Sequence, residues 1–167
     1  ALFEYFGKFK EVWLSVSVEG THGTHEYLRY GHTWRKLTNN LKLVQAMKIK
    51  NLILKINHVV QAPSYHSIMA MTNFFDSIGL EIHPIMLTYP KHFHISALTR
   101  HAKEKFLVDV EDYKGMNKEF INFVKNVTQE NIEQDNTLTV ECVKHLKEFD
   151  MVRKNSYKDI IPIENLS

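Results

Sequence analysis

The sequence predicts an α/β fold that contains a short parallel sheet. Three segments with the two-residue alternation of strands occur at about 12–18, 52–60 and 81–88. Segments with helical periodicity lie between them, so strands and helices alternate along the first half of the chain. This order is typical of parallel strands joined by right-handed crossovers. With 167 residues, the chain is long enough to bury a core.

The first predicted strand separates apolar from polar side chains. Its two faces carry Val12, Leu14, Val16 and Val18 on one side and Trp13, Ser15, Ser17 and Glu19 on the other. The aliphatic face is suited to packing against helices. Ligands in parallel α/β folds bind at the carboxyl ends of the strands. The polar face and the Gly20 turn after it are therefore candidates for a binding site.

The second and third strands follow the same plan. In the segment 52–60, Lys55 and Asn57 fall on the face opposite the aliphatic residues. Pro84 lies inside the third segment and removes a backbone donor from the ladder. We therefore expect the third strand to be bent or to lie near an edge of the sheet.

The alternation of strands and helices ends after the third strand. Residues 91–113 show no clear periodicity, and helical patterns return at about 116–127 and 137–149. We predict two regions: strands and helices over 1–90, and a mostly helical extension over 91–167. Three parallel strands with helices leave an unpaired edge and a poorly covered face. Either the chain associates with a partner, or the first half of the fold is missing.

Composition excludes several classes of function. The net charge of +2 and the scattered Lys and Arg residues give no nucleic-acid signal. No apolar run approaches the ~20 residues that span a bilayer. The chain opens without the basic-then-apolar pattern of a signal peptide, so we expect a cytoplasmic location and no membrane partner. Cys142 is the only cysteine, which excludes an intrachain disulfide or a cysteine-ligated metal site within this chain. We expect it to be a buried structural thiol.

Four polar residues form the best candidate binding set: Ser17, Glu19, Arg29 and Asn57. If the first two strands are parallel neighbours, Ser17 and Asn57 end side by side. A hydroxyl, a carboxylate and an amide there would bind ribose hydroxyls and an amino group, while Arg29 would bind a carboxylate. The alternative is that Ser17 and Asn57 cap the following helices and Arg29 pairs with Glu26 on the surface.

The histidines and Lys55 allow other interpretations. Zinc or iron would use histidine with a carboxylate such as Glu19 or Glu26. The pairs with suitable spacing are His22 with His25 and His92 with His94, but that spacing is generic. Lys55 would be catalytic if a barrel interior lowered its pKa, or it would extend to a solvent-exposed rim. No dinucleotide, P-loop, nucleophile-elbow or zinc-protease motif occurs.

Six segments, at 17–20, 25–29, 34–47, 55–60, 86–90 and 149–162, together resemble the radical SAM superfamily, specifically its twitch and SPASM-related members. The segment Ser17-Val18-Glu19-Gly20 resembles the S-hydrophobic-D-G end of the fourth barrel strand, and His25-Glu26-Tyr27-Leu28-Arg29 resembles the H-D/E-x-x-R motif that follows. Residues 55–60 and 86–90 resemble the fifth strand and the exit of the sixth. The tail from Asp150 and Arg153 to Pro162 is similar to the D-x-x-R…P ending of twitch-domain members. The resemblance covers about residues 12–162.

The resemblance implies a fold and an activity. The chain would form the last three βα units of a partial (β/α)6 barrel, followed by the helical extension. In this family S-adenosylmethionine (SAM) lies on a 4Fe–4S cluster and yields a 5′-deoxyadenosyl radical that abstracts hydrogen from a substrate. The substrate, a peptide, nucleoside or small metabolite, cannot be read from this chain, nor can a catalytic residue.

By the same resemblance, individual residues receive roles toward the cofactor. Ser17 would contact the ribose or the methionine end of SAM, Arg29 its carboxylate and Asn57 its ribose. The backbone near Met86 and Leu87 would line the adenine. Glu19 replaces the usual aspartate, and its additional methylene moves the carboxylate oxygens.

The sequence also departs from the family pattern. The cluster motif C-x-x-x-C-x-x-C and the G-G-E-P motif, which belong to the first half of the barrel, do not occur, nor do the cysteines of auxiliary clusters. We therefore expect the chain to be the C-terminal part of a radical SAM enzyme, unable to hold the cluster or to be active alone. The alternative is a noncatalytic half-barrel module that associates through its exposed sheet edge.

Overall fold

The predicted α/β fold with a parallel sheet is confirmed. The computed structural model describes residues 2–167, apart from the side chains of Leu2 and Ile163, so Ala1 of the predicted first region lies outside the described residues. The strands β1 (Val12–Ser17), β2 (Leu52–Val60) and β3 (Ile82–Met86) form a parallel sheet in the order β1-β2-β3. Pro84 therefore lies in an edge strand of this sheet, where a missing backbone donor is tolerated.

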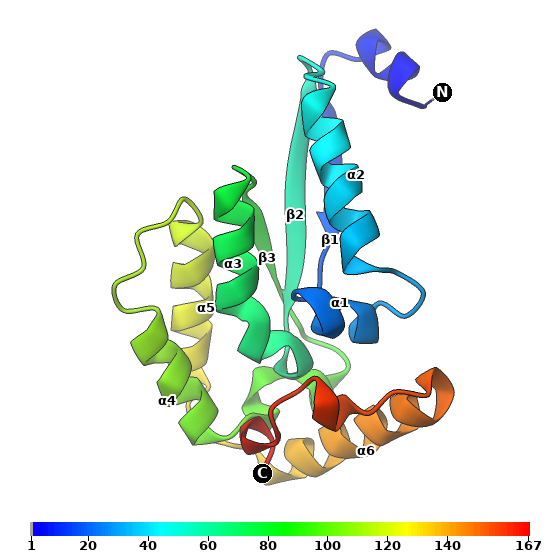
Figure 1. Cartoon of the computed structure of the whole chain (residues 1–167). Coiled ribbons are helices and arrows are strands. Elements are labelled where there is room, and N and C mark those ends of the chain that lie inside the picture. The colour runs from blue at the N-terminus through cyan, green and yellow to red at the C-terminus, as the bar shows by residue number, and fades with distance from the viewer. Residues whose placement is uncertain (1) are drawn as a thin grey trace.

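The connections between the strands lie on one side of the sheet (Figure 1). Helices α1 (His22–Leu28) and α2 (Trp34–Ala46) join β1 to β2. The 3-10 helix η2 (Ala62–Ser67) and the helix α3 (Ile68–Ser77) join β2 to β3. Both crossovers thus cover the same face, which we call the covered face.

The second half of the chain is mostly helical. Its elements are η3 (Lys91–Phe93), η4 (Ile95–Ala97), α4 (Arg100–Asp109), α5 (Lys118–Glu130), α6 (Asn136–Arg153), η5 (Tyr157–Asp159) and η6 (Ile163–Asn165), while η1 (Leu2–Lys8) precedes the sheet. Helix α5 packs beside β3, and α6 crosses beyond the carboxyl ends of the strands (Figure 1). The helices predicted at about 116–127 and 137–149 correspond to α5 and α6.

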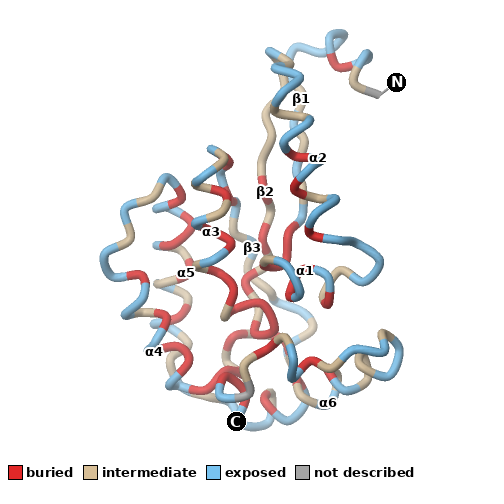
Figure 2. Tube along the Cα trace, in the orientation of Figure 1, coloured by how far each residue is buried: buried red, intermediate tan, exposed pale blue. Residues whose placement is uncertain are grey.

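The core lies between the covered face and the helices, near the carboxyl ends of the strands (Figure 2). Val18 directly after β1, Ile56 and Val60 of β2, and Phe75 of α3 are all 0% exposed. Cys142 of α6 joins the same cluster, and burial raises the pKa of its thiol to about 12. The prediction of a buried structural thiol is confirmed.

The opposite face of the sheet is largely exposed, with α5 bordering it at β3, and we call it the open face. Trp13 of β1 is 57% exposed and Ile85 of β3 is 41% exposed. Ser15, Ser17 and His83 on the same face are also exposed. Parallel sheets are normally buried on both faces, so this exposed face departs from the usual arrangement.

Two buried polar groups fasten the helical half of the chain. Lys103 of α4 donates from Nζ to the Glu133 carbonyl at 2.7 Å, and burial lowers its pKa to about 8. Asn117 receives a hydrogen bond on Oδ1 from the Ile82 backbone at 2.6 Å and donates from Nδ2 to Asp76 at 2.7 Å. The second network ties β3 to α3 and to the start of α5. Within the described residues, no helix is long and apolar enough to cross a bilayer.

Candidate functional site

The turn after β1 fixes the entry to the site. Gly20 has a φ of 96°, a conformation that residues with a Cβ rarely adopt. A Cβ at this position would also collide with Ser67 Oγ and lie 2.8 Å from Thr24 Cγ2. Glycine is therefore required where β1 turns into α1, and this turn places Glu19 at the carboxyl end of the sheet.

Glu19 is buried and uses both carboxylate oxygens. It is 5% exposed, Oε1 accepts from Arg29 Nη2 at 3.0 Å, and Oε2 accepts from Gln61 Nε2 at 3.2 Å. The side chain of Arg29 remains 40% exposed. The pair is thus asymmetric, with a buried anion bound to a cation that still reaches solvent.

Two neutral histidines flank Glu19. Its backbone N–H donates to His25 Nδ1 at 3.3 Å. Burial, followed by the charge of Arg29, lowers the pKa of His25 to about 4. His58 donates from Nδ1 to the Val18 carbonyl at 2.8 Å, and its complete burial lowers its pKa more than nearby Glu19 raises it. The 4.0 Å contact of His58 with Glu19 is therefore not an ion pair at neutral pH.

A row of polar residues crosses the open face near the carboxyl ends. Ser17 lies opposite Asn57 in the β1–β2 register, and Asn57 lies opposite His83 in the β2–β3 register. The predicted adjacency of Ser17 and Asn57 is confirmed. Their side chains make no hydrogen bond to other residues within the described part of the chain, so their donors and acceptors are available to a ligand.

The alternative structural roles of these residues are wrong. The N-cap positions of α1 and η2 are occupied by Thr21 and Gln61, not by Ser17 and Asn57. Glu26 does not pair with Arg29; its Oε1 accepts from the Trp34 backbone at 2.9 Å and so fixes the start of α2.

Met86 and Leu87 lie one strand away from Asn57, at the exit of β3. Met86 pairs with Val60 in the register, and Leu87 packs against the core. The structure thus brings together Ser17 with Asn57 and Glu19 with Arg29. Among residues 2–167, no side-chain hydrogen bond or ion pair joins Met86 or Leu87 to those four residues.

The metal-binding alternatives find no geometric support. Among the described residues, no group of three or more His, Cys, Asp or Glu side chains could hold a metal ion. His25 is occupied by the Glu19 backbone, and His94 Nδ1 lies 2.9 Å from Ser96 Oγ. Cys142 is completely buried. These residues do not fit an iron–sulfur cluster, and we assign no chemical step to one in this chain.

Lys55 of β2 forms two contacts with partly exposed side chains. Its Nζ lies 3.7 Å from Glu81 Oε2 and 4.7 Å from the centre of the Trp13 ring, all on the side of the open face. The lysine therefore covers part of an exposed indole.

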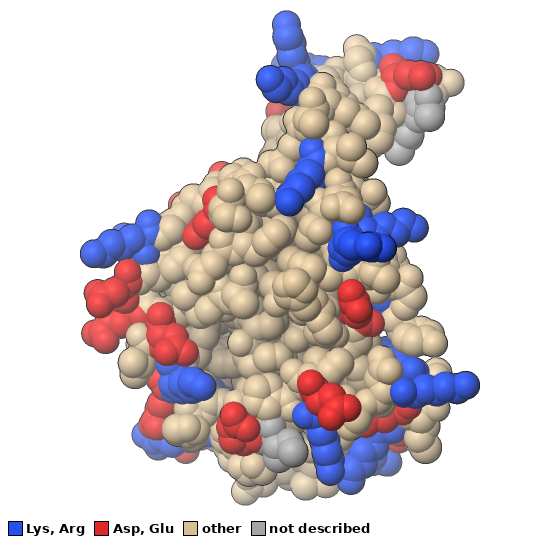
Figure 3. All heavy atoms as spheres, viewed as in Figure 1, with Lys and Arg blue, Asp and Glu red and all other residues tan. Residues whose placement is uncertain are grey.

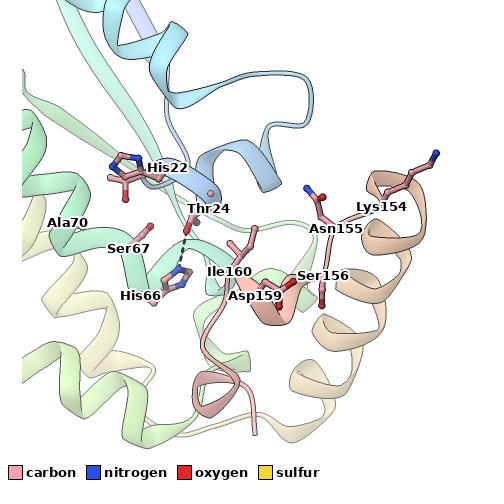
Figure 4. Close-up of a pocket in the computed structure, with 12 residues that line it drawn as sticks. His22, Thr24, His66, Ser67, Ala70, Lys154, Asn155, Ser156, Asp159 and Ile160 are labelled. Atoms are coloured by element: carbon pink, nitrogen blue, oxygen red, sulfur yellow. Dashed lines mark hydrogen bonds between the residues drawn. The ribbon is translucent and has the colours of Figure 1, made fainter.

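A separate polar cavity of about 720 Å³ lies on the helical side of the sheet (Figure 4). Its walls come from the first turn of α1, the start of α3 and the segment 154–160 after α6. His66 lies 3.1 Å from Thr24 Oγ1 through Nε2, and burial lowers its pKa to about 4. Lys154 at the rim is directed away from the cavity (Figure 4). None of the predicted site residues lines it.

Sequence reasoning missed Gln61 and His66, and it did not connect His58, a buried hydrogen-bonded residue of the core, with Glu19. The alternation of β2 places His58 on the covered face with Ile56, and its register places it near Val18, so this neighbour was accessible in principle. Gln61 and His66 lie beyond the strand, and their contacts depend on the geometry of η2, which periodicity does not specify.

The charged side chains form no single-sign patch on the face shown in Figure 3. On the face shown in Figure 3, Lys and Arg side chains are interspersed with Asp and Glu around a largely uncharged centre. The chain matches no protein-family model, no curated protein and no solved structure.

Proposed function

We propose that this chain supplies the SAM-binding edge in the second half of a radical SAM barrel. The observation that carries the proposal is the open face, where Ser17 and Asn57 offer available polar groups at the carboxyl ends of parallel strands. The partly exposed Arg29, bound to Glu19, lies at the same end of the sheet. The covered face with its helices corresponds to the outside of such a barrel and the open face to its interior. The helical extension that follows corresponds to the twitch-like region.

The available groups fit the polar parts of SAM. The Ser17 hydroxyl and the Asn57 amide are suited to ribose hydroxyls. Arg29 uses one N–H on Glu19 and keeps others for a carboxylate, which a guanidinium binds bidentately. Glu19 therefore acts by orienting Arg29 rather than by binding the cofactor. The backbone at Met86 and Leu87 keeps the role toward adenine that the resemblance implies.

SAM on a 4Fe–4S cluster would supply a radical for hydrogen abstraction from a peptide, nucleoside or small metabolite. The described residues provide no site for that cluster, so its ligands would come from the first half of the barrel. The polar contacts of the proposed binding edge come from Ser17, Asn57 and Arg29 of this chain, so they can be tested without the cluster.

Binding of SAM to this chain tests the proposal through a matched pair of serines. Ser17→Ala and Ser15→Ala each remove one serine hydroxyl from the same face of β1, at positions two residues apart. We expect SAM to shift amide NMR signals near Ser17 and Asn57 with a Kd of about 1 mM, because only half of the site is present. Ser17→Ala should weaken binding about 5- to 10-fold, the value of one hydrogen bond of about 1 kcal/mol. Ser15→Ala should leave it unchanged. Absence of saturable shifts, or equal effects of both variants, would contradict the proposal.

The location of the cluster ligands has its own test. Anaerobic incubation of the chain with iron and sulfide should leave no bound cluster with its visible absorption. A stable four-iron cluster held by this chain alone would show that the division into two halves is wrong.

A second candidate function is that of a noncatalytic module that associates through the sheet. The specific observation is the unpaired outer edge of β1 within residues 2–167, next to the 57% exposed Trp13. Sedimentation equilibrium distinguishes it: self-association that Trp13→Lys abolishes favours this function. Leu43→Lys, at a residue 60% exposed on α2, is the control. A monomer at all concentrations argues against self-association.

A further inference from the structure

We propose that Asp150 and Arg153, at the carboxyl end of α6, are positioning residues that hold α1 so that Arg29 faces Glu19. They are the two residues of the D-x-x-R pattern, which the proposed binding edge does not use. The inference rests on the proposed function only where SAM affinity is the readout, since the geometry of Arg29 can be measured without the cofactor.

Helix α1 needs external support. It spans His22–Leu28, only seven residues, and the Thr21 side chain forms no cap hydrogen bond. Isolated helices shorter than about 12 residues are marginal in water. The last carbonyls of any helix lack partners within the helix. The orientation of α1 must therefore come from tertiary contacts.

Asp150 and Arg153 both contact Tyr27 of α1. The Tyr27 hydroxyl donates to Asp150 Oδ1 at 2.8 Å and lies 3.0 Å from the Leu146 carbonyl. Arg153 Nη1 donates to the Tyr27 backbone carbonyl, one of the carbonyls at the end of α1. A cation at this position also stabilises the helix dipole. One side chain thus fixes the ring of Tyr27 and the other fixes its backbone.

The two contacts act from one face of α6. Asp150 and Arg153 are three residues apart, the spacing that places side chains together on a helix. The Arg153 guanidinium lies 4.1 Å from the centre of the Phe149 ring and 5.2 Å from that of Tyr27. Tyr27 itself is only 1% exposed. Cation–π contacts and burial therefore restrict the arginine to this geometry.

Asp150 also fixes the chain that follows α6. Its Oδ1 accepts from the Tyr157 backbone at 2.8 Å as well as from Tyr27. The segment 154–160 that this bond holds forms one wall of the cavity in Figure 4, opposite the first turn of α1. One carboxylate oxygen thus joins α1, α6 and the returning chain.

The path from Tyr27 to the candidate site is short. Arg29 is two residues further along, and its backbone N–H donates to the His25 carbonyl at 2.8 Å. His25 in turn accepts from the Glu19 backbone. A rotation or shift of α1 would therefore change the 3.0 Å contact between Arg29 and Glu19. Helix α6 lies at the same end of the sheet as this contact (Figure 1).

Replacement of Arg153 tests the inference through the guanidinium signals of Arg29. We expect the resonance of Arg29 Nη2, the nitrogen bound to Glu19, to be resolved in ¹⁵N NMR and its protons to exchange slowly in the wild-type chain. In Arg153→Met it should broaden or exchange at least about tenfold faster, and Arg153→Lys should restore part of the protection because it keeps a donor and the charge. Arg100→Met is the control, since Arg100 pairs with Glu104 and Glu133 on an exposed surface. All spectra are recorded well below the urea midpoint of each variant, so that lost stability alone does not change the signal.

Three outcomes separate the inference from the proposed function. An unchanged Arg29 signal in folded Arg153→Met overturns the inference. A changed Arg29 signal together with at least about tenfold weaker SAM binding supports both. A changed signal in a chain that does not bind SAM even in the wild type supports the positioning role and contradicts the proposed function. If Arg153→Met does not fold, the same Arg29 signal is compared in Asp150→Asn, which keeps an oxygen acceptor, and in Asp150→Ala, which does not. Equal protection of Arg29 in both variants overturns the inference.

Discussion

The two faces of the sheet are built from alternate residues of the same strands, but their side chains differ in solvent exposure and in hydrogen bonding. On the covered face, Ile56 and His58 of β2 are 0% exposed, whereas on the open face Trp13 and Ile85 are 57% and 41% exposed. The covered face buries apolar area and one neutral histidine, His58. The open face leaves a serine and an amide without partners among the described residues. We infer that stability resides on the first face and ligand chemistry on the second.

The largest expected effect contrasts two isoleucines on neighbouring strands. Ile56→Ala should lower the free energy of unfolding by about 2–5 kcal/mol, because it removes a buried side chain and leaves a cavity. Ile85→Ala, on the open face, should cost only about 0.5 kcal/mol. Urea denaturation of both variants measures the difference. Similar losses would indicate that the open face is covered in solution.

The next effect concerns the ion pair of Arg29 with Glu19, which follows the carboxyl end of β1. Arg29→Met should destabilise the chain by about 1–3 kcal/mol, because it leaves one oxygen of the buried Glu19 carboxylate without its charged partner. The figure lies below that for a fully buried pair because Arg29 is partly exposed. Arg100→Met should cost no more than about 1 kcal/mol, since its partners are exposed. Equal losses would contradict the special role of Glu19.

A third contrast depends on pH. The folded chain holds His25 and His66 at pKa values of about 4, and it also lowers the pKa of His58, whereas an unfolded histidine titrates near about 6.5. Between these values the unfolded chain binds more protons, so stability is complete above about pH 6.5 and falls as the pH decreases toward 4. Urea midpoints measured from pH 7 to pH 5 should show this decrease, with a shallower slope in His58→Gln. Asn57→Gln, the neighbouring position on the open face, should retain the wild-type slope.

The smallest effect belongs to the open face itself. Lys55→Met removes the contacts with Glu81 and with the Trp13 ring, both partly exposed, and should change stability by less than about 1 kcal/mol. The same substitution should alter the fluorescence of Trp13, which reports the local contact. A loss comparable with that of Ile56→Ala would show that this face contributes to the core.

The strand-level features of the site were predictable because they follow from short periods in the sequence. Alternation sorted Ser17 and Asn57 onto one face, and parallel order placed them at the same end. The register that pairs them confirms both steps. The resemblance to radical SAM enzymes, by contrast, stays a prediction, since no comparison tests it.

The contacts of Arg29 and Tyr27 were not predictable, because they do not follow from short periods in the sequence. In the sequence, Arg29 has two possible carboxylate partners, Glu19 and Glu26. The path of the Gly20 turn and of α1 determines that Arg29 binds Glu19. Tyr27 binds Asp150 across 123 positions of sequence. Contacts at such separation depend on the packing of α6, which has no signature in local periodicity.

Because Cys142 is the only cysteine in the sequence, the stability of the packing of α6 can be measured in the wild-type protein. Cys142 is completely inaccessible in the folded chain, and thiol reagents attack only the thiolate of an exposed cysteine. Alkylation therefore proceeds only during transient openings of α6, and its rate reports their free energy. The alkylation rate of Cys142 thus measures how often α6, the helix that holds Tyr27, detaches. A ligand that stabilises the α1 end of the site should lower this rate.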